Sequence, residues 1–361
     1  MRHHTRAFSV TFVTLMALLA HAQSVQAQQP AISAISGSTT QGSLITITGT
    51  NLHAERMQGW DNRFLRIPTA WSFEGTSATA DGYLIPGDGK GGGVYDSSVK
   101  LLGNQSIKFR TNFLNPTCVQ GVGQNYNYSG LDDAASRNSF WLRTYVRFNR
   151  VTNWPTNFQK FIETFYSGYY FQVDVRSAQI GGNPSSWENF HDGISHPRSN
   201  PGGQLQNNRW YAVELHWSAA APRLYEAFVD GVQVYSATPA GTNGSGYHQW
   251  LLFGVINACG TVSWDVEQWM DGLAVGQQRI YPSAIVEVGN GPNYSTATKK
   301  VQAVEQISDT QVSFRLDTSG LGAGPFYVWV RNNAQQQSPA FFLTGGQVSG
   351  PSAPTNLRIT P

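Results

Sequence analysis

The sequence predicts an all-β protein, and three observations carry that prediction. Segments such as Trp141–Phe148 and Tyr169–Arg176 place alternate residues in apolar and polar sets, the period-two pattern of a strand in a sheet. Only 13% of the residues are charged, whereas Gly, Asn, Ser, Thr and aromatic residues are frequent, a composition typical of short strands joined by turns. Beyond the N-terminus, no long stretch has the periodicity of an amphipathic helix. A length of 361 residues indicates two or three such domains.

Residues 1–27 have the pattern of a secretory signal peptide. A positively charged start is followed by the apolar run Phe8–Ala20 and by a small-residue cleavage site that ends at Ala27 or, alternatively, at Ala22. The apolar run is short for a membrane anchor, because a spanning helix needs about 20 apolar residues. We therefore expect a secreted, periplasmic or cell-surface protein with no membrane span after signal removal.

The charge balance argues against two classes of partner. Cleavage after Ala27 removes Arg2 and Arg6, so the 24 basic residues fall to 22, which equals the 22 acidic residues. A formally neutral protein has no overall electrostatic attraction for nucleic acid or for an anionic membrane surface.

Two cysteines, Cys118 and Cys259, are present in the chain. An even number of cysteines in an oxidising compartment favours a disulfide between them. The alternative is a pair of buried free thiols. Neither residue has the neighbours of a metal site or of a catalytic nucleophile.

The two ends of the chain contain what look like two parts of one small sandwich. The segment ITITGTNL, ending at Leu52, resembles the opening of an IPT/TIG domain, an immunoglobulin-like β-sandwich, and ISDTQVSFRL…GLGAGPFYVWVRN resembles its second half. The resemblance implies a discontinuous domain of residues 28–52 and 283–345, with residues 53–282 inserted after Leu52. The alternative is two unrelated β segments that flank the central domain. We expect residues 346–361 to be a linker or a truncated tail.

The middle region contains a series of strand-like segments. His248–Asn257 is apolar on both faces and is expected inside a sheet, and Asp230-Gly231 is a typical hairpin turn. The expected strands lie in Ser106–Phe113, Trp141–Phe148, Phe158–Phe165, Tyr169–Arg176, Asn208–Trp217, Tyr225–Ser236, His248–Asn257 and Trp264–Ile280.

The order and content of these segments resemble a known fold family. The pieces WLRTYVRF…FQKFIETF, NRWYAVELHW, FVDGVQVYS and WMDGLAVGQQRI resemble the concanavalin A-like jelly roll of secreted polysaccharide lyases and glucanases. The resemblance covers residues 53–282. It implies two bent antiparallel sheets, one of which has a concave face that holds a polysaccharide.

A lyase of this family cleaves a uronate-containing glycan by β-elimination. The reaction needs a cation or amide on the uronate carboxylate, a base for the C5 proton and an acid for the leaving oxygen. The resemblance implies that Arg143, Lys160, Gln172 and His216 are candidates for neutralising the carboxylate and removing the proton, and that Tyr145 or Tyr170 is the acid. Of these, we expect His216, Tyr145, Arg143 and Gln172 to catalyse the reaction. The substrate-binding candidates are Arg147, Lys160, Tyr170, Asp174, Trp210 and Glu214.

Other interpretations of the same residues stay open. The lyase signatures RSE, QIH and YFKAG are absent, so a non-catalytic carbohydrate-binding or adhesion module is the main alternative, and a structural surface component is a third. A glycoside hydrolase is less favoured, because Ser263 occupies the place of the nucleophile in the segment SWDVE. Exposed polar faces are common in antiparallel sheets, so Arg143 and its neighbours are either sugar contacts or solvated surface. Glu214 and His216 are either an acid/base pair or structural.

The sequence contains no recognisable metal site. His191 and His196 lie in a loop without a regular scaffold, which makes them weak metal ligands. Asp61 and the pair Asp132-Asp133 form no recognisable Ca²⁺ loop, although a structural Ca²⁺ is common in such folds and stays open. We expect no catalytic cofactor.

Overall fold

The computed structural model describes residues 29–53, 73, 76–77, 92–111, 127–137, 139–150, 158–166, 169–176, 186–191, 194–195, 205–218, 224–238, 248–256, 266–276 and 278–343. Every regular element within these ranges is a β-strand, and all strand pairs are antiparallel, which confirms the all-β class. The expected signal peptide, Cys118, Cys259, Asp61, His196 and the C-terminal tail lie outside the described residues.

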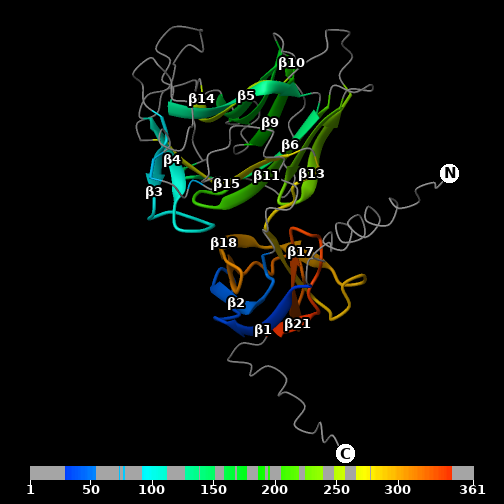
Figure 1. Ribbon diagram of the computed structural model, residues 1–361. Helices are drawn as coiled ribbons and strands as arrows, with labels where there is room; N and C mark the ends of the chain where they lie inside the picture. Colours follow the sequence, from blue (N-terminus) through cyan, green and yellow to red (C-terminus); the bar gives the residue numbers. More distant parts are fainter. Residues whose placement is uncertain are drawn as a thin grey trace, which may run out of the picture.

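The larger sandwich is built from two antiparallel sheets that face each other (Figure 1). The seven-stranded sheet has the order β13-β12-β11-β6-β15-β4-β3, and the six-stranded sheet has the order β10-β9-β8-β7-β14-β5. As expected, β14 is an interior strand. The bounds of the seven-stranded sheet are β3 (Val94–Asp96), β4 (Ser106–Thr111), β6 (Ser139–Phe148), β11 (Trp210–Ser218), β12 (Leu224–Val229), β13 (Val232–Ala237) and β15 (Val266–Gly276). Those of the six-stranded sheet are β5 (Asn127–Arg137), β7 (Phe158–Tyr166), β8 (Tyr169–Arg176), β9 (Ser186–His191), β10 (Ile194–Ser195) and β14 (His248–Ile256).

The inner face of the seven-stranded sheet supplies the core of this sandwich. Because side chains alternate along a strand, every second residue of β6 and β11 lies on this face. These apolar side chains are fully buried, and each contributes about 1.5–3 kcal/mol of transfer free energy. They include Leu142, Val146, Phe148, Val213, Leu215, Trp217, Met270 and Phe109.

The smaller sandwich combines strands from both ends of the chain. Its first sheet has the order β1-β2-β19-β18 and its second the order β17-β16-β20-β21. In the first sheet β2 pairs directly with β19, with Ile47 opposite Val312. The bounds are β1 (Ala31–Ser36), β2 (Leu44–Thr50), β16 (Ala284–Gly289), β17 (Lys299–Val301), β18 (Ala303–Ile307), β19 (Gln311–Arg315), β20 (Phe326–Asn332) and β21 (Phe341–Leu343).

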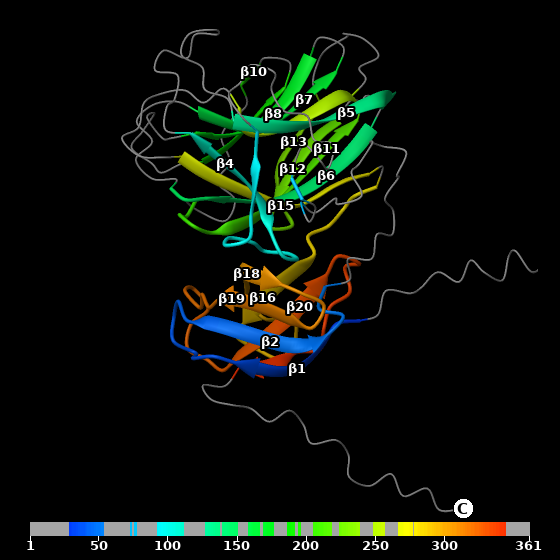
Figure 2. The same cartoon turned by 60° about the vertical axis from the view of Figure 1, so that its left-hand side comes forward.

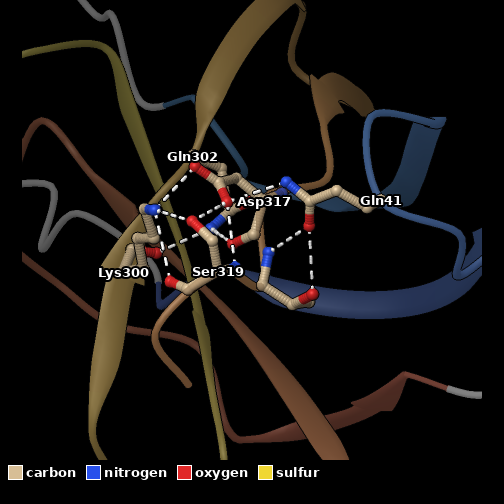
Figure 3. A network of polar contacts seen from close by, with 6 residues as sticks. Gln41, Lys300, Gln302, Asp317 and Ser319 are labelled. Carbon is tan, nitrogen blue, oxygen red and sulfur yellow. Dashed lines mark hydrogen bonds and ion pairs between the residues drawn. The ribbon is translucent and has the colours of Figure 1, made fainter. Parts of the chain in front are cut away.

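A polar network around Asp317 ties the N-terminal segment to the C-terminal one (Figure 3). Gln41 Nε2 donates to Asp317 Oδ1 at 2.9 Å, Ser319 Oγ donates to the same oxygen at 2.7 Å, and Lys300 Nζ lies 2.7 Å from Oδ2. The Asp317 amide donates to Gln302 Oε1 at 2.7 Å. Burial raises the pKa of Asp317, but the hydrogen bonds from Lys300, Ser319 and Gln41 outweigh it and hold the pKa well below its ordinary value. The network therefore favours the charged carboxylate.

The seven-stranded sheet lies between the six-stranded sheet and the smaller sandwich (Figures 1 and 2). We call the contact between its outer face and the smaller sandwich the seam. At the seam, the Ile307 amide donates to the Leu101 carbonyl at 2.9 Å. Asp271 of β15 is buried and holds the loop before β4 against the larger sandwich. Its Oδ2 accepts hydrogen bonds from the amides of Leu101 and Leu102, each at 2.9 Å. The outer face of this sheet is therefore partly an internal surface of the molecule.

Candidate functional site

The predicted site residues lie on two different sheets. Arg143, Tyr145 and Arg147 are on β6, and Trp210, Glu214 and His216 are on β11, both in the seven-stranded sheet. Lys160 is on β7, and Tyr170, Gln172 and Asp174 are on β8, in the six-stranded sheet. The resemblance implied that the concave face of one sheet holds the polysaccharide, and residues of two sheets cannot all lie on that face. Alternation shows which residues of a strand share a face, but not to which sheet that strand belongs.

Arg143 and Tyr145 lie in the seam. The Arg143 Nη1 donates to Ser283 Oγ at 2.6 Å, and the Ser283 amide donates to Tyr145 Oη at 2.5 Å. Arg143 is 1% exposed and Tyr145 is 3% exposed. Ser283 comes immediately before β16, so both side chains hold the smaller sandwich. We expected Arg143 and Tyr145 on an open face, in contact with a sugar or with solvent, but both are buried between the two sandwiches.

Glu214 is also part of the seam. It faces Arg143 across the β6–β11 pair and is fully buried. Arg279 Nε donates to Glu214 Oε2 at 2.7 Å, and Arg279 Nη2 donates to Oε1 at 3.3 Å. Burial raises the pKa of Glu214 above its ordinary value and outweighs the opposing effects of Arg279, Arg143 and Arg331. Glu214 is thus a buried ion-pair partner and is not exposed to a polysaccharide.

Trp210 and Arg147 form a register pair at the other end of the two strands. Trp210 is buried and lines a small pocket of the seam together with Leu101, Tyr145 and Ala284. A ring in this place packs between domains and offers no face for stacking on a sugar. Arg147 is partly buried, and its guanidinium lies 6.0 Å from the Trp269 ring centroid, within range of a cation–π contact.

His216 occupies a different environment from the seam residues. Its Nδ1 lies 2.8 Å from Glu226 Oε2, and its Nε2 lies 3.4 Å from Ser139 Oγ. The imidazole stacks on Trp141, with ring centroids 4.1 Å apart and planes 4° from parallel. Sequence reasoning missed Ser139 and Glu226 as partners of His216, because the contacts arise from the pairing of β6, β11 and β12.

On the six-stranded sheet, the register brings several predicted residues to neighbouring positions. Lys160 of β7 is opposite Asp174 of β8, which in turn is opposite Glu188 of β9. Gln172 is opposite Glu163, and Tyr170 is the next alternate residue of β8. Further register pairs on these strands are Phe165 with Tyr170 and Phe171 with His191. Glu163 and Glu188 were missed by sequence reasoning, because no single strand shows cross-strand partners.

Within the ranges given above, no group of three or more His, Cys, Asp or Glu side chains is placed so that it could hold a metal ion. In the same ranges, no helix is both long enough and apolar enough to cross a membrane.

These observations define the class of protein: an all-β chain of two sandwiches, in which one sheet of the larger sandwich packs on the smaller one. No protein-family model and no curated protein matches the chain. Among solved structures it is similar to a cellulose induced protein, Cip1, with 16% identity and a TM-score of 0.43 over 58% of this chain and 98% of that one. It is also similar to an endo-beta-1,4-glucuronan lyase from the fungus Trichoderma reesei, with 12% identity and a TM-score of 0.41 over 55% and 92% of the two chains. A third similar structure is a mutant of the alginate lyase Aly36B in complex with an alginate trisaccharide. It has 14% identity and a TM-score of 0.37 over 52% of this chain and 88% of that one.

Proposed function

We propose that this chain is a secreted polysaccharide-active protein that binds a uronate-containing glycan on its six-stranded sheet. The observation that carries the proposal is the register of β7, β8 and β9, which places Lys160, Asp174 and Glu188 in one row and Glu163 and Gln172 in the next. Lys160 and Gln172 can donate hydrogen bonds to the carboxylates of an acidic sugar chain, and the acidic residues can accept hydrogen bonds from its hydroxyl groups.

The reaction proposed for this sheet is β-elimination. Gln172 donates a hydrogen bond to the uronate carboxylate and so stabilises the negative charge that develops beside C5, and Lys160 in its neutral form removes the C5 proton. The electron pair left on C5 forms the C4–C5 double bond, the C4–O bond breaks, and Tyr170 gives a proton to the leaving oxygen. These roles keep the residue types that the sequence suggested and move the chemistry off the seven-stranded sheet.

A second candidate function is a non-catalytic glycan-binding or adhesion module. The observation that favours it is the structural use of Arg143 and Tyr145, which bind Ser283 in the seam. Two of the four residues expected to catalyse the reaction are thus committed to holding the domains together.

The domain organisation belongs to the same proposal. The smaller sandwich is an IPT/TIG-like domain of residues 28–52 and 283–345, interrupted by the larger sandwich. The pairing of β2 with β19 supports this division, because one sheet needs both segments. Export through the predicted signal peptide places the protein outside the cytoplasm, where polysaccharides occur.

The test is a panel of acidic and neutral polysaccharides, with two readouts. Ultraviolet absorbance detects the unsaturated uronate that elimination creates, and affinity electrophoresis detects binding. The proposal predicts new absorbance with an acidic polysaccharide, lost in Lys160→Ala and Tyr170→Phe and kept in Tyr327→Phe, a control on the smaller sandwich. Retarded migration without absorbance supports the binding module. Neither signal on any polysaccharide overturns the proposal.

A further inference from the structure

Three side chains on neighbouring strands of the seven-stranded sheet form a continuous hydrogen-bonded chain, which we call the relay. Ser139 begins β6, His216 lies on β11 and Glu226 lies on β12. His216 is opposite Glu226 in one strand pair, and opposite Trp141 in the other. The order of contacts is Ser139 Oγ to His216 Nε2 at 3.4 Å, then His216 Nδ1 to Glu226 Oε2 at 2.8 Å.

The direction of the hydrogen bonds follows from the groups involved. A carboxylate oxygen only accepts hydrogen bonds, so Nδ1 of a neutral His216 carries the hydrogen and donates a hydrogen bond to Glu226 Oε2. Nε2 is then left with its lone pair toward Ser139, whose hydroxyl donates. This is the arrangement in which an imidazole acts as a general base toward a serine hydroxyl.

The surroundings hold the relay in place. Gln233 Nε2 donates to Glu226 Oε1 at 2.8 Å, which fixes the second carboxylate oxygen. The stack on Trp141 fixes the plane of the imidazole. Groups outside the relay therefore orient both the Glu226 carboxylate and the His216 imidazole, as an efficient general base requires.

The relay is accessible to solvent, unlike the seam residues of the same face. The side chains of His216 and Glu226 are 13% and 18% exposed, and Ser139 is partly exposed. Glu214, two residues before His216 on the same strand and the same face, is fully buried. The relay thus lies where the outer face emerges from beneath the smaller sandwich.

We propose that Ser139 is a nucleophile activated by His216, that Glu226 is a positioning residue, and that the relay hydrolyses carboxylic esters. Ser139 Oγ attacks the ester carbonyl carbon while its proton passes to His216 Nε2. The carbonyl electron pair moves to oxygen and returns as the bond to the alcohol breaks, and His216 gives the proton to the leaving oxygen. Water then attacks the acyl group on Ser139, with His216 taking its proton and returning it to Oγ, and the carboxylic acid leaves.

This activity is separate from the proposed function. It uses the seven-stranded sheet and acyl transfer, whereas the polysaccharide proposal uses the six-stranded sheet and elimination. Variants at Ser139 do not touch the residues named for elimination, so the failure of one proposal is distinguishable from the failure of the other.

The experiment combines covalent labelling with a kinetic assay on the full chain. A fluorophosphonate probe is added, the labelled peptide is identified by mass spectrometry, and hydrolysis of p-nitrophenyl acetate is followed in parallel. The proposal predicts an adduct on Ser139 and hydrolysis above the buffer rate. Ser139→Ala abolishes both, and His216→Asn lowers the hydrolysis rate by about 100-fold or more.

Two further variants separate the chemistry from a structural effect. Glu226→Gln keeps the size of the side chain and is predicted to lower kcat about tenfold or more with little change in KM, because it loses the carboxylate that orients and balances the imidazolium. Ser236→Ala, at an exposed serine of β13 opposite Glu226, keeps full labelling and hydrolysis. An unlabelled Ser139, or labelling and hydrolysis unchanged in Glu226→Gln with the fold intact by circular dichroism, overturns the proposal.

Discussion

At the scale of single residues, Tyr145 shows how a side chain with suitable chemistry can have a different use. Its hydroxyl accepts a hydrogen bond from the Ser283 amide, and both residues are buried. Sequence alternation correctly placed Tyr145, Arg143 and Arg147 on the polar face of one strand. It could not show that the polar face of this strand meets a second domain, since that contact joins residues 138 positions apart in the sequence.

Replacement of Tyr145 by phenylalanine tests this use. Tyr145→Phe removes an acceptor from a buried amide, which costs about 1–3 kcal/mol of unfolding free energy. Urea unfolding followed by tryptophan fluorescence measures it. The control is Tyr327→Phe, at a partly exposed tyrosine of β20, for which we expect little change. Equal midpoints for the two variants would contradict a structural role of the Tyr145 hydroxyl.

The buried carboxylate of Glu214 makes stability depend on pH. Its pKa is raised in the folded protein, so the folded state binds a proton more readily than the unfolded state does. The stability that this group contributes is present below its unfolded pKa and is lost as the pH rises through the folded pKa. We therefore expect the stability of the wild type, relative to Glu214→Gln, to fall as the pH rises above the ordinary pKa of a glutamate side chain.

Unfolding free energies of both proteins from urea titrations at several pH values measure this difference. Glu305→Gln, on β18, serves as a control for the loss of one negative charge. If the wild type instead gains stability relative to Glu214→Gln as the pH rises, the Arg279 ion pair outweighs burial.

At the scale of elements, the hairpin of β12 and β13 was predictable from its turn residues. Asp230 and Gly231 have φ values of 51° and 79°, and Val229 is opposite Val232, as a two-residue turn with positive φ requires. The sequence could not show that the turn also touches the smaller sandwich. A Cβ at Gly231 would lie 2.7 Å from Ile285 Cδ1.

Gly231→Ala is expected to be destabilising for two reasons. A left-handed φ costs an alanine about 1–2 kcal/mol, and the new methyl group must push Ile285 aside. Gly42→Ala is the matched control, because Gly42 has a φ of 82° and a Cβ added there would have no other atom within 4 Å. Thermal unfolding should show a larger loss for Gly231→Ala. Equal losses would mean that the contact with Ile285 adds nothing.

The candidate site was predictable strand by strand but not as a group. The alternation of Tyr170, Gln172 and Asp174 marked β8 as a strand with a polar face, and β8 is indeed a strand. Which strands pair with it depends on long-range register, and Lys160 reaches the position opposite Asp174 only through a register shift in β7. Local patterns contain no information about such a shift.

At the scale of the whole molecule, the seam joins the two sandwiches into one structural unit. The Ile307 amide, the Arg143 guanidinium and the Gly231 turn all make contacts across it. The all-β class followed from composition and alternation, because both are local properties. The packing of the sandwiches did not, because the sequence pattern of an outer polar face is the same whether it meets water or a polar seam.

We expect the two sandwiches to unfold together. Loss of the smaller sandwich would expose the buried Arg143 and Glu214 side chains, which is costly for the larger one. Differential scanning calorimetry should therefore show one transition whose calorimetric and van't Hoff enthalpies agree. Two resolved transitions would show that the seam contributes little to stability.

We propose that the glycan binds the six-stranded sheet, because the smaller sandwich covers part of the outer face of the seven-stranded sheet, including Arg143, Tyr145 and Glu214. Amide hydrogen exchange with and without a bound acidic polysaccharide tests it most directly, since it reports protection strand by strand. We predict slower exchange in β7, β8 and β9 on addition of the polysaccharide, and unchanged exchange in β6 and β11. Protection confined to β6 and β11 would contradict the claim.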